Sequence, residues 1–422
     1  MDKIFYSFVY FNPTGGLMVD YFAIKQMLEK EGQPQLLRCY DALSDGERET
    51  FLSEISRIDF SFFNRAEHSK RIRSCDISPL DIFTSHMAEQ RREELEAAGL
   101  AAIGEGRIAA VLLCGGQGTR LGFDHSKGMY DIGLTRPLSI FELHFSYMLG
   151  VAKRAGTWFP IFIMTSEIND SEIREFLAAH DYFGYNGEFV HFYVQNMVPS
   201  TDLDGKILMG GRASLAMSPD GNGGWFSSLV SAGLLDFVKT SGVEWFNVVS
   251  IDNVLQRTVD PLFVGATLCS GADCGAKVIK KATPDERIGL ICQNAGHPSV
   301  IEYYELDRLI REENVNTDGI EYGVILNYLF RTDRMEGTLS HPLPVHKVRK
   351  KIPYFDDGEL IVPEWENGYK YEMLATDLVE FMGSCLPYEV RREAEFAPVK
   401  NRDGADSVDS AREMLMAAGY TL

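Results

Sequence analysis

The stretch that decides the fold is "RIAAVLLCGGQGTRLGFDHSKGMYDIGL", residues 107–134. It begins with an uninterrupted apolar run, which is typical of a strand buried on both faces of a parallel sheet. The run ends in a glycine-rich loop at residues 115–118. Glycines at the carboxyl end of such a strand allow backbone N–H groups to approach a phosphate closely. Arg120 and Lys127 add two cations beside the loop, so the stretch predicts a phosphate-binding crevice in an α/β protein.

Two common phosphate-binding loops do not fit this stretch. A P-loop requires GxxxxGK[ST], whereas Lys127 precedes Gly128 here. A dinucleotide fingerprint requires GxGxxG, and Leu121 stands where its third glycine would be. A dinucleotide-dependent oxidoreductase is therefore only a distant alternative.

Apolar runs and amphipathic segments alternate along the middle of the chain. This alternation predicts a mostly parallel sheet with helices on both faces. The further buried strands are expected at residues 159–166, 189–195 and 244–253, and short strands at 273–303. The helices between them are expected at residues 138–154, 170–180 and 223–240. Later segments, at 322–330 and 369–383, also predict helices.

The composition limits the class of partner. The formal net charge is −20, and so acidic a surface repels nucleic acid and anionic membranes. The seven cysteines are odd in number and show no CxxC spacing, which favours reduced thiols over a zinc site or a disulfide framework. No run reaches about 18 apolar residues, and the N-terminal segment lacks the features of a signal peptide. We therefore expect a cytoplasmic protein that binds neither nucleic acid nor membrane.

The glycine loop also carries a family resemblance. GGxGTRLG followed by a lysine and GMYD resembles the eukaryotic-type UDP-sugar pyrophosphorylases, and most closely the UDP-N-acetylhexosamine pyrophosphorylases. The blocks "MSPDGNGGWFSSL", "SIDNVL", "VIEYYE", "NGYKYE" and "EFAPVKNRDGADS" match the same family in order. The resemblance covers residues 33–417, and the blocks are specific in combination.

The resemblance implies a reaction and its partners. A sugar 1-phosphate would attack the α-phosphorus of UTP, giving a UDP-sugar and pyrophosphate, with Mg²⁺ as the metal and Mn²⁺ as its alternative. The first expectation for the sugar is N-acetylglucosamine 1-phosphate. The alternatives are another sugar 1-phosphate, such as that of glucose or galactose, or a catalytically weak protein that binds a UDP-sugar. A monomer is favoured.

The resemblance also implies roles for individual residues. Arg120, Lys127 and Lys400 would be the catalytic cations, and Asp252 at the end of a buried strand would bind the metal. A guanidinium suits bidentate contact with phosphate, and a carboxylate is a natural ligand of Mg²⁺. The substrate would be bound by residues of several blocks: Gly115, Gly116, Gly118, Gln195, Gly221, Asn222, Gly223, Glu302, Gly323 and Lys370.

The fold class expected from this resemblance is α/β. It comprises a helical N-terminal region at 1–100, a Rossmann-like nucleotidyltransferase core with a mixed central sheet at 101–385, and a short C-terminal segment at 386–422. The C-terminal β subdomain of the family is expected to be missing.

The sequence departs from the family pattern at three places. Ser126 replaces a proline before the loop lysine, so we expect a less rigid loop. Leu138 stands where the family has a second loop lysine. The block "IEYGVI" at 320–325 keeps Gly323 but has Glu321 and Val324 in place of asparagines, which predicts an altered sugar pocket.

Overall fold

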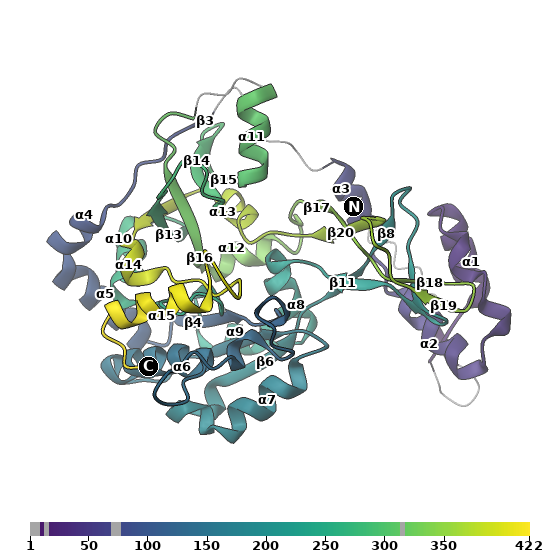
Figure 1. Cartoon of the computed structure of the whole chain (residues 1–422), viewed down its shortest axis with the longest axis horizontal. Coiled ribbons are helices and arrows are strands. Elements are labelled where there is room, and N and C mark those ends of the chain that lie inside the picture. Colours follow the sequence, from purple (N-terminus) through teal and green to yellow (C-terminus); the bar gives the residue numbers. More distant parts are fainter. Residues whose placement is uncertain (1–8, 12–16, 69–76, 313–316) are drawn as a thin grey trace. The chain divides into compact units, whose positions relative to one another are not determined.

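The computed structural model describes residues 9–11, 17–68, 77–312 and 317–422 (Figure 1). The chain forms two compact units, each assembled from separated segments. The first unit consists of residues 1–70, 196–221 and 344–374, and the second of residues 71–195, 222–343 and 375–422. The division predicted from sequence, with boundaries at 100 and 385, follows the chain continuously, whereas these units interleave along it.

Four neighbouring parallel strands form one side of the ten-stranded central sheet of the second unit. They lie in the order β12 (Trp245–Ser250), β4 (Ile108–Leu113), β5 (Ile161–Thr165) and β6 (Val190–Val194). All four confirm predicted strands, and the residues of β4 and β5 are buried throughout. Because the strands are parallel, their carboxyl ends lie side by side at one end of the strands, which is called the carboxyl edge below.

The other side of the sheet is largely antiparallel, so the predicted mixed central sheet is confirmed. Strand β16 (Tyr322–Arg331) runs antiparallel to β12 and continues the sheet. The remaining strands of this side are β3 (Ile77–Ser78), β13 (Cys274–Lys280), β14 (Leu290–Asn294), β15 (His297–Ile301) and β21 (Cys385–Glu389). The predicted helix at 322–330 is therefore wrong. A continuous apolar run fits a buried strand as well as a buried helix, and both edges of β16 are paired with other strands.

The helices of the second unit have identifiable start and stop signals. Helix α6 (Ile140–Ala155) begins at Ser139, whose Oγ accepts from the Glu142 N–H at 3.1 Å, and it ends at Gly156 with φ 71°. The predicted helix at 223–240 divides into two at Gly233, whose φ is 77°. The helices of this unit are α4 (Ser85–Gln90), α5 (Arg92–Gly104), α6, α7 (Asp170–Ala179), α8 (Trp225–Ser231), α9 (Leu235–Ser241), α10 (Pro261–Ser270), α11 (Tyr303–Glu312), α12 (Thr332–Gly337), α13 (Asp377–Phe381), α14 (Arg392–Glu395) and α15 (Val408–Ala417).

The first unit combines helices with short strands. Its helices are α1 (Tyr21–Lys30), α2 (Asp45–Ser56) and α3 (Ser61–His68). Its strands are β1 (Val9–Phe11), β2 (Leu17–Val19), β7 (Met197–Pro199), β8 (Thr201–Asp202), β9 (Met209–Gly211), β10 (Ser214–Leu215), β11 (Met217–Pro219), β17 (His346–Lys350), β18 (Tyr354–Asp356), β19 (Glu359–Ile361) and β20 (Gly368–Glu372). Ile24 and Phe51 pack in one core with Leu215 from the middle of the chain. The helix predicted at 369–383 begins as β20 and becomes helical only at α13.

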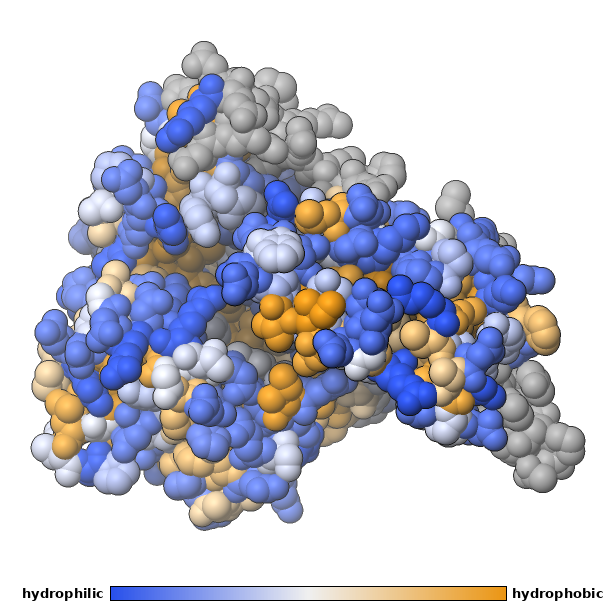
Figure 2. All heavy atoms as spheres, turned by 45° about the vertical axis from the view of Figure 1, so that its right-hand side comes forward, coloured by the Kyte–Doolittle hydropathy of each residue, from blue (hydrophilic) through white to orange (hydrophobic). Residues whose placement is uncertain are grey.

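The surface is mainly hydrophilic, as Figure 2 shows for one face. Apolar side chains are exposed mostly in small groups, such as Leu360, Val362 and Trp365 near β19. Among the residues that the structure describes, no helix is long and apolar enough to span a bilayer.

Helices α5 and α10 approach each other through two glycines. A Cβ atom on Gly265 would lie 1.7 Å from the Leu95 carbonyl oxygen, and one on Gly99 would lie 1.8 Å from the Pro261 carbonyl oxygen. Backbone atoms cannot give way as a flexible side chain can, so this helix crossing depends on both glycines.

We predict that Gly265→Ala destabilises the second unit, because the added methyl group must push two helix backbones apart. The expected loss of unfolding free energy is about 1–3 kcal/mol or more. Gly150→Ala in α6 is the matched control, since no heavy atom would lie within 4 Å of its Cβ. It should be neutral or stabilise by up to about 1 kcal/mol. Denaturant unfolding of the two variants measures both effects, and equal stabilities would contradict the proposed helix contact.

Candidate active site at the carboxyl edge of the parallel strands

The loops that follow the four parallel strands meet at one edge of the sheet. Gly115 follows β4, and Gln195 directly follows β6. A Cβ atom on Gly115 would lie 3.1 Å from Oε1 of Gln195, so the glutamine side chain rests against the glycine. The backbone N–H of Gln195 donates to the Thr165 carbonyl at 2.9 Å, and its side chain is largely buried. The structure therefore brings these two predicted residues together.

The glycine loop folds back on itself. The N–H of Gly118 donates to the His125 carbonyl at 2.9 Å, and a Cβ there would lie 2.9 Å from the Phe123 ring. A Cβ on Gly128 would lie 2.4 Å from the Phe141 ring, so this position also requires glycine. Gly116 differs, because no heavy atom would lie within 4 Å of its Cβ and the residue is exposed. The loop is thus closely packed at its base and open at Gly116.

The predicted catalytic cations gather around Lys127. Its Nζ lies 3.9 Å from Oδ2 of Asp252, and both side chains are mostly buried. Burial lowers the pKa of Lys127, the Asp252 carboxylate raises it, and the positive charges of Lys400 and Arg120 lower it further. Arg120 itself is exposed. Lys400 also pairs with Asp406 at 3.2 Å, so the cluster holds three cations and two carboxylates. A polyanion such as a triphosphate would stabilise the remaining positive charge.

Lys400 reaches this cluster because its segment is hydrogen-bonded to the turn after β12. The Val399 N–H donates to the Asp252 carbonyl at 2.8 Å. The Asn253 side chain accepts from the Ala397 N–H at 2.8 Å and donates to the Glu395 carbonyl at 2.7 Å. Two distant segments therefore form one unit, with Asn253 as a residue that the sequence interpretation missed.

A second group of predicted residues surrounds Gly289. A Cβ on Gly289 would lie 3.5 Å from both carboxylate oxygens of Glu302, and the Gly289 carbonyl accepts from the Val324 N–H at 2.9 Å. Glu302 Oε1 also accepts from the Thr376 hydroxyl at 3.0 Å. Gly323 lies next to Val324 in β16, and a Cβ there would lie 2.6 Å from the Ile288 side chain. The sequence pattern gave no signal for Gly289 or Thr376.

The remaining predicted substrate residues divide between the two units. Gly221 and Lys370 belong to the first unit, where Gly221 has φ 90° and a Cβ on it would lie 2.3 Å from the Met373 carbonyl oxygen. Lys370 is half-buried in β20. Asn222 and Gly223 belong to the second unit and precede α8, and Asn222 Oδ1 accepts from the Ala375 N–H at 2.8 Å. Gly221 and Lys370 therefore do not belong to the group of predicted site residues that the second unit contains.

Leu138 is buried in the core and places no charge near the glycine loop. It is 3% exposed, and its N–H donates to Oδ1 of Asp131 at 2.9 Å. The family's second lysine has no counterpart at this position.

A histidine that the sequence interpretation overlooked lies beneath the turn of Asp252. His144 of α6 is 2% exposed, and its Nε2 donates to the Ile251 carbonyl at 3.2 Å. Burial lowers the pKa of His144 to about 4, against the carbonyl hydrogen bond and the Asp252 charge, which raise it. Within the described residues its Nδ1 has no hydrogen-bond partner. The ring is therefore neutral at pH 7.

The carboxylates that the structure describes do not form a resident metal centre. Among those residues no group of three or more His, Cys, Asp or Glu side chains could hold a metal ion. Mg²⁺ commonly binds through one or two carboxylates, with substrate phosphates and water completing its shell. Asp252, which lies beside the cations, has the donor chemistry to bind a metal of that kind.

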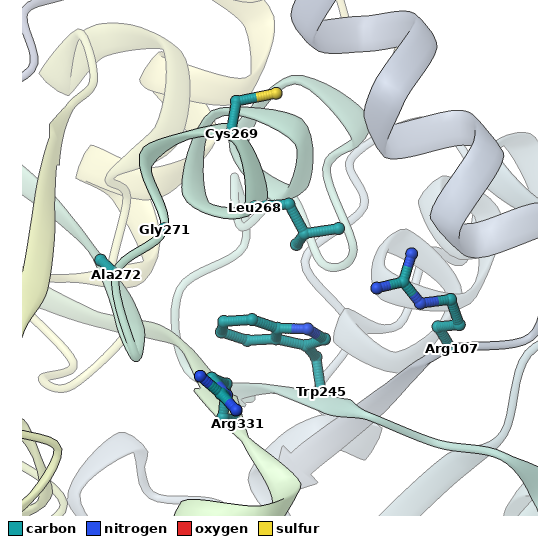
Figure 3. A pocket seen from close by; sticks show the side chains of 7 residues that line it. All are labelled: Arg107, Trp245, Leu268, Cys269, Gly271, Ala272 and Arg331. Carbon is teal, nitrogen blue, oxygen red and sulfur yellow. The ribbon is translucent and has the colours of Figure 1, made fainter.

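A pocket of about 380 Å³ lies near the amino ends of the parallel strands, at the opposite end of these strands from the candidate site (Figure 3). Figure 3 shows the guanidinium groups of Arg107 and Arg331 on either side of the Trp245 indole. Arg107 pairs with Glu244 at 2.7 Å, and Arg331 pairs with Asp273 at 2.8 Å. Because carboxylates neutralise both cations, this pocket is a poor site for phosphate.

The fold and the site define an α/β protein with a cluster of cations at the carboxyl ends of its parallel strands, and comparisons with known proteins give the family. Residues 56–417 match the family model described as UTP--glucose-1-phosphate uridylyltransferase. The chain is 33% identical to UDP-N-acetylhexosamine pyrophosphorylase-like protein 1 of Mus musculus, over 94% of this chain and 84% of the relative. It is also 33% identical to UDP-N-acetylglucosamine diphosphorylase 2 of Arabidopsis thaliana, over 93% and 83%.

A solved structure agrees with these relatives. The UDP-N-acetylglucosamine pyrophosphorylase of Trypanosoma brucei, in complex with an inhibitor, superposes with a TM-score of 0.80 at 29% identity. That comparison covers 95% of this chain and 85% of the other. The chain belongs to the UDP-sugar pyrophosphorylase family, and the resemblance noted from its motifs is confirmed.

We predict that His144 makes folding stability fall as the pH is lowered below about 6.5. An unfolded chain takes up a proton on this histidine near pH 6.5, whereas the folded protein takes it up only near pH 4. The unfolded state therefore binds more protons in this window. The contribution of His144 is complete above pH 7 and should fall by about 2–3 kcal/mol by pH 4.5.

His144→Gln is the control, because its amide can still donate to the Ile251 carbonyl but does not titrate. Denaturant unfolding of both proteins from pH 8 to pH 4.5 measures the difference in their unfolding free energies. The contributions of other titrating groups are common to both proteins and cancel in this difference. Parallel stability curves for the two proteins would show that His144 does not have the lowered pKa.

Proposed function

We propose that this protein is a uridylyltransferase that forms UDP-N-acetylglucosamine and pyrophosphate from UTP and N-acetylglucosamine 1-phosphate. The observation that carries the proposal is the convergence of Arg120, Lys127, Lys400 and Asp252 at the sheet edge where Gly115 meets Gln195. The relatives named above support the choice of reaction and sugar. A binding protein without activity is not favoured, because Arg120, Lys127, Lys400 and Asp252 are all present and the relatives named above are pyrophosphorylases.

The chemistry requires charge stabilisation more than proton transfer. The attacking phosphate oxygen is already an anion, so no side chain has to remove a proton from it. The oxygen forms a bond to the α-phosphorus of UTP as the bond to the pyrophosphate oxygen breaks. Catalysis of this kind depends on positioning and on fixed positive charge around the phosphates.

The cations of the cluster can divide this work. Lys127 would neutralise the α-phosphate, and Arg120 would grip the pyrophosphate that leaves. Lys400, on the segment hydrogen-bonded to Asp252, would supply further positive charge. Asp252 would hold Mg²⁺, and the bound ion would offset phosphate charge. Burial lowers the pKa of Lys127, and the negative charge of bound phosphates would raise it.

The other predicted residues would bind the two ends of the nucleotide sugar. Gln195 would face the uracil edge, because an amide both donates and accepts. The backbone of Gly115, Gly116 and Gly118 would hold the nucleotide. Glu302 would accept from sugar hydroxyls.

Five further predicted residues would complete the contacts with the substrates. Gly223 and Asn222, with Gly221, would pack against the base and ribose. Gly323 would lie near the sugar, and Lys370 would approach the phosphates.

Several broader expectations also stay proposals. We group the parallel side of the sheet with the Rossmann-like nucleotidyltransferase cores, because ligands of open α/β sheets bind at the carboxyl ends of the strands. The cytoplasmic location and the monomeric state are proposed from the sequence.

We expect pyrophosphate release only when UTP, a divalent metal and a sugar 1-phosphate are all present. N-acetylglucosamine 1-phosphate should give a higher kcat/KM than glucose or galactose 1-phosphate, and ATP and GTP should be poor replacements for UTP. Excess EDTA should abolish turnover. Glucose 1-phosphate as the best substrate would contradict the sugar assignment, and UTP binding without turnover on any sugar would contradict the reaction.

We also expect Arg120→Ala and Lys127→Ala each to lower kcat by about 100-fold, the usual effect of losing one preorganised charge. Thermal stability should change little. Lys239→Ala is the control, because its Nζ pairs with Glu336 at 2.8 Å and belongs to no proposed site. Kinetics with the preferred sugar phosphate measure the effect, and near-normal kcat in either loop variant would place the phosphates elsewhere.

A further inference from the structure

The first turn of α7 provides a carboxylate that binds the base of the glycine loop. Glu172 Oε1 accepts from the backbone N–H of Ser126 at 2.7 Å. Its Oε2 accepts from Nδ1 of His125 at 3.0 Å. Both contacts fall immediately before Lys127, and the carboxylate comes from a helix that follows a different strand.

Backbone hydrogen bonds hold other parts of this segment: the Gly118 N–H donates to the His125 carbonyl at 2.9 Å, and the Met129 N–H donates to the Ser126 carbonyl at 3.0 Å. The contacts at the N–H and Nζ of Lys127 are longer. The Lys127 N–H reaches the Gly116 carbonyl at 3.4 Å, and Nζ is 3.9 Å from Asp252. Both distances are long for strong contacts. Ser126 by contrast is fully buried, and its N–H bond to Glu172 is short and charge-assisted. Glu172 therefore holds the N–H of the residue that precedes Lys127.

We propose that Glu172 is a positioning residue that aims Lys127 at the reacting phosphate. This inference rests on the proposed function for the role of Lys127. The two hydrogen bonds that Glu172 accepts from Ser126 and His125, called the clamp below, do not rest on it. Glu172 acts through the loop backbone and contacts no proposed substrate group. Misplacement of a catalytic group by about 1 Å can lower a rate by up to about 100-fold.

The backbone at Ser126 offers an independent way to test the clamp. Ser126 has φ −56° and ψ 134°, which a proline ring can adopt. A proline there would lose the N–H, and its Cδ would point at the Glu172 carboxylate that now lies 2.7 Å from the nitrogen. Proline should therefore fit poorly while Glu172 is present and well once that side chain is removed. The clamp predicts opposite effects of one substitution in two backgrounds.

The experiment compares Glu172→Ala, Ser126→Pro and the double variant with the wild type in steady-state kinetics. Glu172→Ala should lower kcat about tenfold or more, with each KM changed less than about threefold. Ser126→Pro alone should also lower kcat. The double variant should have a higher kcat than Glu172→Ala, because the proline ring fixes φ of residue 126 when the carboxylate is absent.

Two further variants separate positioning from a general effect on α7. Glu172→Gln keeps an oxygen that can accept from the Ser126 N–H, and its kcat should stay within about threefold of the wild type. Glu175→Ala is the matched control on the same helix, because its carboxylate is exposed and accepts only from the Ser171 hydroxyl among the hydrogen bonds described. It should leave kcat unchanged.

Hydrogen exchange of the segment 116–130 provides a readout that does not need catalysis. Its amides should exchange faster in Glu172→Ala than in the wild type, Glu172→Gln or Glu175→Ala, and the double variant should restore protection. A wild-type protein without pyrophosphate release would refute the proposed function, and the exchange data would still test the clamp. The clamp is refuted if Glu172→Ala matches Glu175→Ala in exchange. The positioning role is refuted if their kcat values match, or if proline further slows a folded Glu172→Ala protein.

Discussion

The parallel pairing of β12, β4, β5 and β6 is the constraint on which the site depends. Ser250 lies opposite Leu113, Leu113 opposite Met164, and Met164 opposite Tyr193, so the four strands end at nearly the same level. Each loop that leaves this edge then places one kind of group beside the others. The glycines, the amide and the carboxylate come from different parts of the chain, and the sheet register alone brings them together.

Holding several cations at this edge has an electrostatic cost, and neighbouring polar contacts offset it. Lys127 is mostly buried, and the charges of Arg120 and Lys400 oppose its own. Asn253 and Glu172 hold the two segments that carry Lys400 and Lys127, and both act through backbone groups. The net charge of −20 makes this local concentration of positive charge distinct from the rest of the protein.

Sequence reasoning could predict the parts of this account that depend on local pattern. The strand and glycine loop within 107–134 show their character in consecutive residues, and Asp252, the proposed metal ligand, follows the evident strand β12. The strand at 322–330 was mistaken for a helix, because the partners on both of its edges are distant in sequence. The first unit follows no continuous stretch of sequence, since residues 196–221 and 344–374 join the N-terminal region only in space. Glu172 lies in no recognised motif, and Asn253 lies in the block "SIDNVL" without a predicted role, because both residues act on backbone groups that they reach only after folding.

The central claim is that the nucleotide binds at the carboxyl edge of the parallel strands, and a crystal structure with UDP-N-acetylglucosamine and Mg²⁺ tests it most directly. The account predicts the uracil against Gly115 and Gln195, with the diphosphate within hydrogen-bonding distance of Lys127. Density for the nucleotide in the pocket between Arg107 and Arg331, near the amino ends of the parallel strands, would contradict it.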